Sequence, residues 1–203
     1  MDRRELTERF TAKALAVSST VVEAGDLNEA AEYAVRLFTE KVFSRPASPG
    51  PHGGGKTLAA PGMPEPLFAR LSELAELAEL AGLAGAAGVE VISGGLRNRM
   101  DGVDVGFSLG GMGVAETGTV ILRCPGEDAR LASMICETHV IALPKSRIAA
   151  TSQDAEAFLR ESMATPMYTA FISGCSRTSD IERVLALGVH GPLELHIVLT
   201  EEE

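Results

Sequence analysis

Apolar and polar positions change their spacing several times along the chain, and each change marks a different predicted element. Apolar side chains recur at helical spacing over residues 3–17 and 27–43, and residues 18–26 between them are typical of a short strand and turn. Asp26 is the expected N-cap of the second helix, with Glu29 completing a capping box. Leucines repeating every three residues predict another amphipathic helix over residues 67–83.

Strand and helix patterns alternate from Val89 onward. Runs rich in Val, Ile and Phe predict strands over residues 89–92, 104–109, 114–123, 140–143, 167–172 and 193–199. Helical patterns lie between them, over residues 128–135, 152–163 and 179–187. This alternation predicts an α/β fold with a mostly parallel sheet flanked by helices and an N-terminal helical layer. Ligands of such sheets bind beyond the carboxyl ends of the strands, so the loops that follow strands are the places to search.

The length favours one domain over residues 1–203, made of three parts. Residues 1–43 form the N-terminal helices, residues 44–66 a connection, and residues 67–203 the α/β core. Six of the ten prolines and five of the 21 glycines fall within residues 44–66, which predicts a flexible segment.

That proline-rich segment contains a match to the phosphate-loop pattern G-x-x-x-x-G-K-[ST] at residues 50–57. A working phosphate loop needs a buried strand before it and a helix after it. Prolines on both sides oppose these two elements, so we interpret the match as coincidental. His52, within the same segment, is given no chemical role.

Composition narrows the classes of function. The net charge of −10 and an aromatic content of 4% argue against nucleic acid and anionic membrane surfaces as partners. No apolar run reaches the roughly 18 residues of a membrane span, and the first residues do not resemble a signal peptide, so a cytoplasmic location is expected. Cys124, Cys136 and Cys175 are too far apart for an iron–sulfur or zinc motif, and we expect no metal and no redox cofactor in this chain.

The first candidate segment covers residues 113–122, where an apolar strand is interrupted by Glu116, Thr117, Gly118 and Thr119. The glycine permits a bulge or a close approach to a ligand, and both hydroxyls can donate to an anion or a carbonyl. Taken alone, these residues favour a bulged strand whose threonines satisfy the local backbone.

The second candidate segment follows a predicted strand that ends at Ile172. Part of it is explained by a capping box, in which Ser179 and Glu182 cap the next helix and Asp180 complements its dipole. Capping leaves four polar residues without a role, namely Ser173, Ser176, Arg177 and Thr178. Their position after a strand and before a helix N-terminus favours an anion site.

The histidines add one open case. His190 lies where the second segment's helix is expected to end, beyond Gly188, and either bonds backbone carbonyls or faces a ligand. His139 and His196 are lone histidines with no acid or nucleophile within reach in the sequence. For both we expect a buried imidazole with its hydrogen bonds satisfied.

Three segments in this order, residues 114–119, 173–182 and 187–192, resemble the lactate-utilisation protein C family, which is built on the LUD domain. The resemblance covers roughly residues 89–200. It implies an α/β fold shared with ribose-phosphate isomerase and CoA transferases. It also implies a role in the oxidation of L-lactate to pyruvate beside partner subunits that carry iron–sulfur clusters. By matching position, it places a site for a small organic acid or a partner at Glu116, Thr117, Gly118, Thr119, Ser176, Arg177, Thr178, Asp180 and His190.

A second class of function stays open beside this one. The shared fold also allows a free-standing enzyme that acts on a carboxylate or an acyl-CoA. In that case Glu116 is the candidate nucleophile, because carboxylates serve this role in covalent catalysis.

Overall fold

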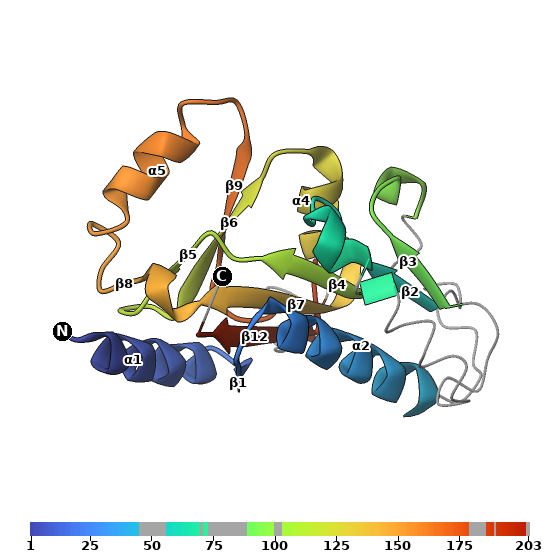
Figure 1. Ribbon diagram of the computed structural model, residues 1–203, viewed down its shortest axis with the longest axis horizontal. Helices are drawn as coiled ribbons and strands as arrows, with labels where there is room; N and C mark the ends of the chain where they lie inside the picture. Colours follow the sequence, from blue (N-terminus) through green and yellow to red (C-terminus); the bar gives the residue numbers. More distant parts are fainter. Residues whose placement is uncertain are drawn as a thin grey trace.

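The computed structural model describes residues 1–44, 56–69, 71–72, 89–99, 103–178, 186–188 and 190–201. Its elements in chain order are shown in Figure 1. They are α1 (Arg3–Ala16), β1 (Ser19–Ala24), α2 (Leu27–Ser44), β2 (Lys56–Ala59), β3 (Val89–Ile92), the 3-10 helix η1 (Leu96–Asn98), β4 (Val103–Leu109), β5 (Met112–Val114), β6 (Thr119–Cys124), α4 (Glu127–Ile135), β7 (Cys136–Pro144), the 3-10 helix η2 (Lys145–Arg147), β8 (Ile148–Ala149), α5 (Glu156–Ser162), β9 (Tyr168–Ile172), β10 (Arg177–Thr178), β11 (Ala186–Leu187) and β12 (Glu194–Thr200).

The main sheet has six strands in the order β1-β12-β7-β4-β2-β3. Every pairing in it is parallel, which confirms the predicted α/β class with a mostly parallel sheet. The last strand, β12, lies between β7 and β1, and β1 forms one edge of the sheet (Figure 1).

Side chains alternate between the two faces of β7 and show how the helices cover the sheet. Val140 and Ala142 pack into a core cluster with α2, whose Phe38 is buried there. Ile141 and Leu143 point the other way, into a cluster that contains Phe10 of α1. The helices α1 and α2 therefore flank the sheet on opposite faces.

A second sheet has the strand order β8-β5-β6-β9, with antiparallel β5–β6 and β6–β9 pairs. The sequence predicts a single strand over residues 114–123, but the structure divides it into β5 and β6. A turn over residues 115–118 separates the two, and Gly118 has a φ of +67° that an L side chain rarely adopts.

The prediction of a flexible connection over residues 44–66 was wrong for its second part. Residues 56–59 form β2 inside the main sheet, and Leu58 and Ala59 are fully buried. Asp104 also accepts a hydrogen bond from the amide of Thr57 at 2.8 Å. Lys56 and Thr57 thus lie in a strand, not at the start of the helix that a phosphate loop requires, while residues 45–55, including His52, lie outside the described residues.

Two predicted helices are described only in part. Residues 65–69 and 71–72 are helical, and the rest of the helix expected over residues 67–83 lies outside the described residues. Of the helix expected over residues 179–187, residues 179–185 also lie outside the described residues. Residues 186–187 form the short strand β11, so the helical prediction was wrong there, and Gly188 follows a strand.

Candidate functional site

Glu116, in the turn between β5 and β6, is fastened to the loop before α5. One of its carboxylate oxygens, Oε1, accepts hydrogen bonds from the amide and from the hydroxyl of Ser152, both at 2.8 Å. Both hydrogen bonds lower the pKa of Glu116, and the bond from the Ser152 amide has the larger effect. The carboxylate is therefore ionised at neutral pH and holds two loops together.

A row of hydroxyl groups joins the two candidate segments. The side-chain oxygens of Thr117 and Thr119 are 2.7 Å apart, and the Thr119 oxygen is also 2.7 Å from the hydroxyl of Ser173. Antiparallel pairing of β6 with β9 brings them together, because Val120 is in register with Ile172. Thr119 is buried, whereas Thr117 and Ser173, at the two ends of the row, are both exposed.

Gly118 is in close contact with a helix. A Cβ atom added there would lie 2.3 Å from the amide nitrogen of Ala14 and 2.5 Å from the carbonyl carbon of Lys13. The absence of a side chain therefore lets the turn pack against the backbone of α1. This contact gives Gly118 a structural role.

The second candidate loop is bound to the segment before β12. The amide of Ser176 donates to the carbonyl of Pro192 at 2.9 Å, and the amide of Gly188 donates to the carbonyl of Ser176 at 3.0 Å. Arg177 and Thr178 form β10, which pairs with β11, and Arg177 and His190 are exposed. Asp180 lies outside the described residues.

The structure thus places some of the predicted site residues in contact with one another, whereas others contact different parts of the chain. The two segments touch through Thr119 and Ser173, and Ser173 did not belong to the set that the family resemblance indicated. Ser176 has its backbone partners at Pro192 and Gly188, in the third segment of the resemblance.

His196 is buried, as expected, but the expectation that no acid lies within its reach was wrong. Its Nε2 is 3.1 Å from a carboxylate oxygen of Glu194, two residues earlier on the same strand. Its Nδ1 is 2.7 Å from the hydroxyl of Tyr33 on α2. Lys41 donates to the other Glu194 oxygen at 2.6 Å, which closes a network between α2 and β12.

His139 is also buried, but only one of its ring nitrogens is satisfied. Its Nε2 is 3.0 Å from the hydroxyl of Ser108, and its Nδ1 has no hydrogen-bond partner among the described residues. Burial lowers the pKa of His139 to about 4, so the ring is neutral at physiological pH. The expectation of a fully satisfied histidine was therefore wrong, and nothing in the sequence indicates the open nitrogen.

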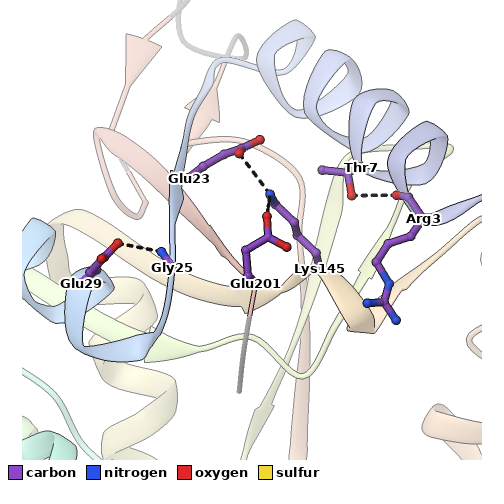
Figure 2. Close-up of polar contacts among 7 residues, drawn as sticks. All are labelled: Arg3, Thr7, Glu23, Gly25, Glu29, Lys145 and Glu201. Carbon is purple, nitrogen blue, oxygen red and sulfur yellow. Dashed lines mark hydrogen bonds and ion pairs between the residues drawn. The ribbon is translucent and has the colours of Figure 1, made fainter.

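At the carboxyl edge of the main sheet, where such folds bind ligands, one lysine is paired with two carboxylates. Lys145, directly after β7, donates to Glu23 of β1 at 3.0 Å and to Glu201, which follows β12 (Figure 2). Burial acts to lower the pKa of Lys145, but its hydrogen bonds to Glu201 and Glu23 outweigh this effect and raise it. The cluster ties together the ends of three adjacent strands.

Figure 2 also shows how α2 begins. The amide of Glu29 donates to Asp26 at 2.9 Å, which confirms Asp26 as the cap of this helix. The Glu29 side chain accepts from the amide of Gly25 at 2.7 Å, one residue before the cap, so the prediction that Glu29 completes a capping box with Asp26 was wrong.

The described parts of the chain offer neither a metal site nor a membrane-spanning helix. Among these residues, no three or more His, Cys, Asp or Glu side chains are grouped so that they could hold a metal ion. Nor is any helix there both long and apolar enough to cross a membrane.

The architecture is that of an α/β domain with a parallel six-stranded sheet, to which a second sheet adds two polar loops joined by hydroxyl contacts. The chain belongs to the LUD-domain family, whose family model matches residues 7–200.

Curated relatives are similar over part of the chain. A lactate utilization protein C from Geobacillus thermodenitrificans is 33% identical over 103 residues, which is 48% of this chain and 43% of that protein. The lactate utilization protein C of Anoxybacillus flavithermus is 35% identical over 99 residues, which is 48% of this chain and 44% of that protein. That of Bacillus subtilis is 31% identical over 103 residues, which is 49% of this chain and 43% of that protein. The matched region thus spans less than half the length of these relatives.

One solved structure is similar over nearly the whole chain. The crystal structure of a DUF162 family protein from Deinococcus radiodurans superimposes with a TM-score of 0.60, covering 98% of this chain and 99% of that one. At 15% sequence identity, this likeness shows the shared fold.

Proposed function

We propose that this protein is a cytoplasmic, non-redox component of a lactate-utilisation system that supports the oxidation of L-lactate to pyruvate. The observation that carries the proposal is the LUD-domain match over residues 7–200, together with relatives that are named lactate utilization protein C. Electrons from lactate pass to partner subunits that contain iron–sulfur clusters, and this chain holds no redox cofactor.

The cysteines support a non-redox role. Cys124 and Cys136 are both buried, and burial raises the pKa of each thiol, in Cys136 to about 12. An iron–sulfur cluster normally takes four thiolate ligands, whereas this chain has three cysteines, which stand far apart in the sequence at positions 124, 136 and 175.

The loops at Glu116–Thr119 and Ser176–Asp180 bind either a small organic acid or a partner surface in this proposal. Two features support it. Thr117 presents an exposed hydroxyl at the end of the row that continues through Thr119 to Ser173. Arg177, on the second loop, is exposed, and its guanidinium suits a carboxylate.

The test is L-lactate-dependent dye reduction in extracts of a strain that lacks the gene, before and after the gene is restored from a plasmid. Loss of activity followed by its recovery is expected. Unchanged activity in the deletion strain would remove the lactate role.

Two variants then test the loops. Arg177→Ala should fail to restore full dye reduction, whereas Arg160→Ala, in an exposed i,i+4 pair with Glu156 on α5, should restore it. Equal recovery with both variants would place the functional contact away from Arg177. For the partners, protein purified with a tag from its own host should bring down subunits that contain iron and acid-labile sulfide.

A further inference from the structure

The strand β9 forms one edge of the second sheet, where the described residues give it a single neighbouring strand, β6 (Figure 1). Its register with β6 runs through all five residues, Tyr168–Ile172, without a bulge. The outer side of β9 therefore presents backbone amide and carbonyl groups that no other described strand pairs. Such an edge can accept a further strand from another chain.

The other edge strands of the two sheets carry features that oppose pairing with another chain. β1 has the exposed Glu23, β3 has the exposed Glu90, and β8 is only two residues long. β9 has five residues and contains no charged residue, proline or glycine. Charge, proline and short length are the means by which native edges avoid further pairing, and β9 has none of the three.

Large apolar side chains at this edge remain accessible. Tyr168 is 50% exposed and Phe171 is 58% exposed, and they lie on opposite faces of β9 because side chains alternate along a strand. Met134 of α4, which is 48% exposed, lines the same small cavity as Tyr168 and Ile172. Exposed apolar side chains that lie together mark interaction surfaces, in which Tyr, Phe and Met are enriched.

Two cations beside β9 are already compensated within the chain. Arg123, on the neighbouring strand β6, pairs with Glu161 at 3.0 Å. Arg130, whose guanidinium lies 5.5 Å from the centre of the Tyr168 ring, pairs with Glu127 at 3.5 Å. A second copy has the same net charge of −10, so the two copies repel each other overall, but at this edge it meets cations that already have carboxylate partners.

The sequence of β9 is complementary to itself in antiparallel pairing. When two copies pair about a two-fold axis at Ala170, Tyr168 lies opposite the partner's Ile172. Thr169 then lies opposite the partner's Phe171. Each aromatic ring thus faces a β-branched side chain, a combination that stabilises antiparallel strands, and the symmetry produces every such pair twice.

We propose that a second copy of this chain docks on β9, so that the two β9 strands pair antiparallel about a two-fold axis at Ala170. The two four-stranded sheets then continue into each other across the dimer. The self-complementary strand and its neutralised surroundings fit this partner. The proposal goes beyond the lactate role and does not depend on it.

Sedimentation equilibrium on the full chain measures the association. The mean mass should rise from 21.3 kDa toward twice that value as the protein concentration increases. Phe171→Lys should raise the dimer Kd about 10-fold, because both pairs of Phe171 with Thr169 are lost. Leu15→Lys is the matched control, since it replaces an apolar side chain of similar exposure, 54%, on α1 and should leave the Kd unchanged.

Two results would overturn the proposal at this stage. One is a parent chain that stays at 21.3 kDa up to about 1 mM, because a specific dimer is populated at that concentration. The other is an equal change of Kd in the Phe171→Lys and Leu15→Lys variants. Circular dichroism of both variants establishes that they are folded.

An introduced charge pair tests the register. Adding Thr169→Glu to the Phe171→Lys variant places each new lysine opposite a new glutamate of the partner subunit. The dimer Kd should then fall by about 3- to 10-fold relative to Phe171→Lys alone at low salt, because opposite charges that face each other across paired strands attract. A double variant that associates no more tightly than the single one would contradict the proposed pairing.

Cysteine cross-linking locates the axis without weakening the interface. In a Cys175→Ser background, Ala170→Cys places two thiols at the axis, where paired strands bring Cα atoms about 4.5–5.5 Å apart, within disulfide range. Mild oxidation should join this variant into a covalent dimer. Thr169→Cys should not cross-link, because its two copies are offset along the strands by more than about 7 Å. Failure of Ala170→Cys to cross-link, or equal cross-linking of both variants, would refute the axis.

Discussion

Replacing Gly118 with alanine tests whether this glycine seats α1 against the turn between β5 and β6. The new methyl group would lie 2.3 Å from the amide nitrogen of Ala14 and 2.7 Å from its Cα atom. Both atoms belong to a helix backbone that cannot rotate away as a side chain could. Either α1 or the turn must therefore move.

The magnitude has two parts. An alanine held at a φ of +67° costs about 1 kcal/mol relative to glycine. Forcing apart packed backbone costs about 1–3 kcal/mol more. The free energy of unfolding should fall by about 2–4 kcal/mol in total, and for a chain of this size each kcal/mol lowers Tm by about 2–4 °C.

Gly62→Ala is the matched control, because Gly62 has a φ of +73° and no atom within 4 Å of the added methyl group. It should lose only the conformational part, about 1 kcal/mol. Both variants and the parent protein are compared by urea unfolding followed by circular dichroism. Equal losses in the two variants would refute the contact with α1 and would return Gly118 to the ligand-facing role that the family resemblance implies.

Three further predictions follow from charged and titratable groups. Arg177→Ala should change the free energy of unfolding by less than about 1 kcal/mol in urea melts, because the side chain is exposed; a larger loss would make Arg177 structural. The raised pKa of Lys145 means that its stabilisation is present below pH 10.5 and disappears as the pH rises through the folded-state pKa. Lys145→Met should lower Tm at neutral pH and reduce the loss seen above pH 10.5, and an unaltered alkaline profile would contradict this. Since burial lowers the pKa of His139 from 6.5 to about 4, its contribution is present above pH 6.5 and about 3 kcal/mol is lost as the pH falls to about 4. His139→Gln should flatten that part of the stability profile, and an equally steep profile would contradict the assignment.

The strands could be predicted where the apolar signal is local and strong. Runs rich in β-branched residues at Val89–Ile92 and over residues 140–143 indicate strands whatever their neighbours are, although the second strand, β7, begins four residues earlier, at Cys136. Residues 56–59 carry no such signal, because prolines and glycines surround them. Their strand depends on pairing with β3 and β4, and neither pairing is evident from the local sequence of residues 56–59.

The polar contacts also fall into two groups: those between residues close in the sequence could be predicted, and those between distant elements could not. Glu194 stands two residues before His196, and side chains at that spacing share one face of a strand, so this pair could have been found from the sequence. The contact of His196 with Tyr33, like that of Thr119 with Ser173, depends on packing between elements far apart in the chain. Whether Nδ1 of His139 finds a hydrogen-bond partner among the described residues depends on which side chains fold around it, and no local sequence pattern encodes that.

The position of β12 between β1 and β7 determines the order in which the protein can assemble. Ser19 pairs with Leu195, so β1 has no sheet partner among the described residues until the far end of the chain has been synthesised. Loop closure over such a separation is slow and raises the contact order. The nascent chain on the ribosome therefore carries an incomplete sheet with unpaired strand edges, and folding finishes only after β12 has left the exit tunnel.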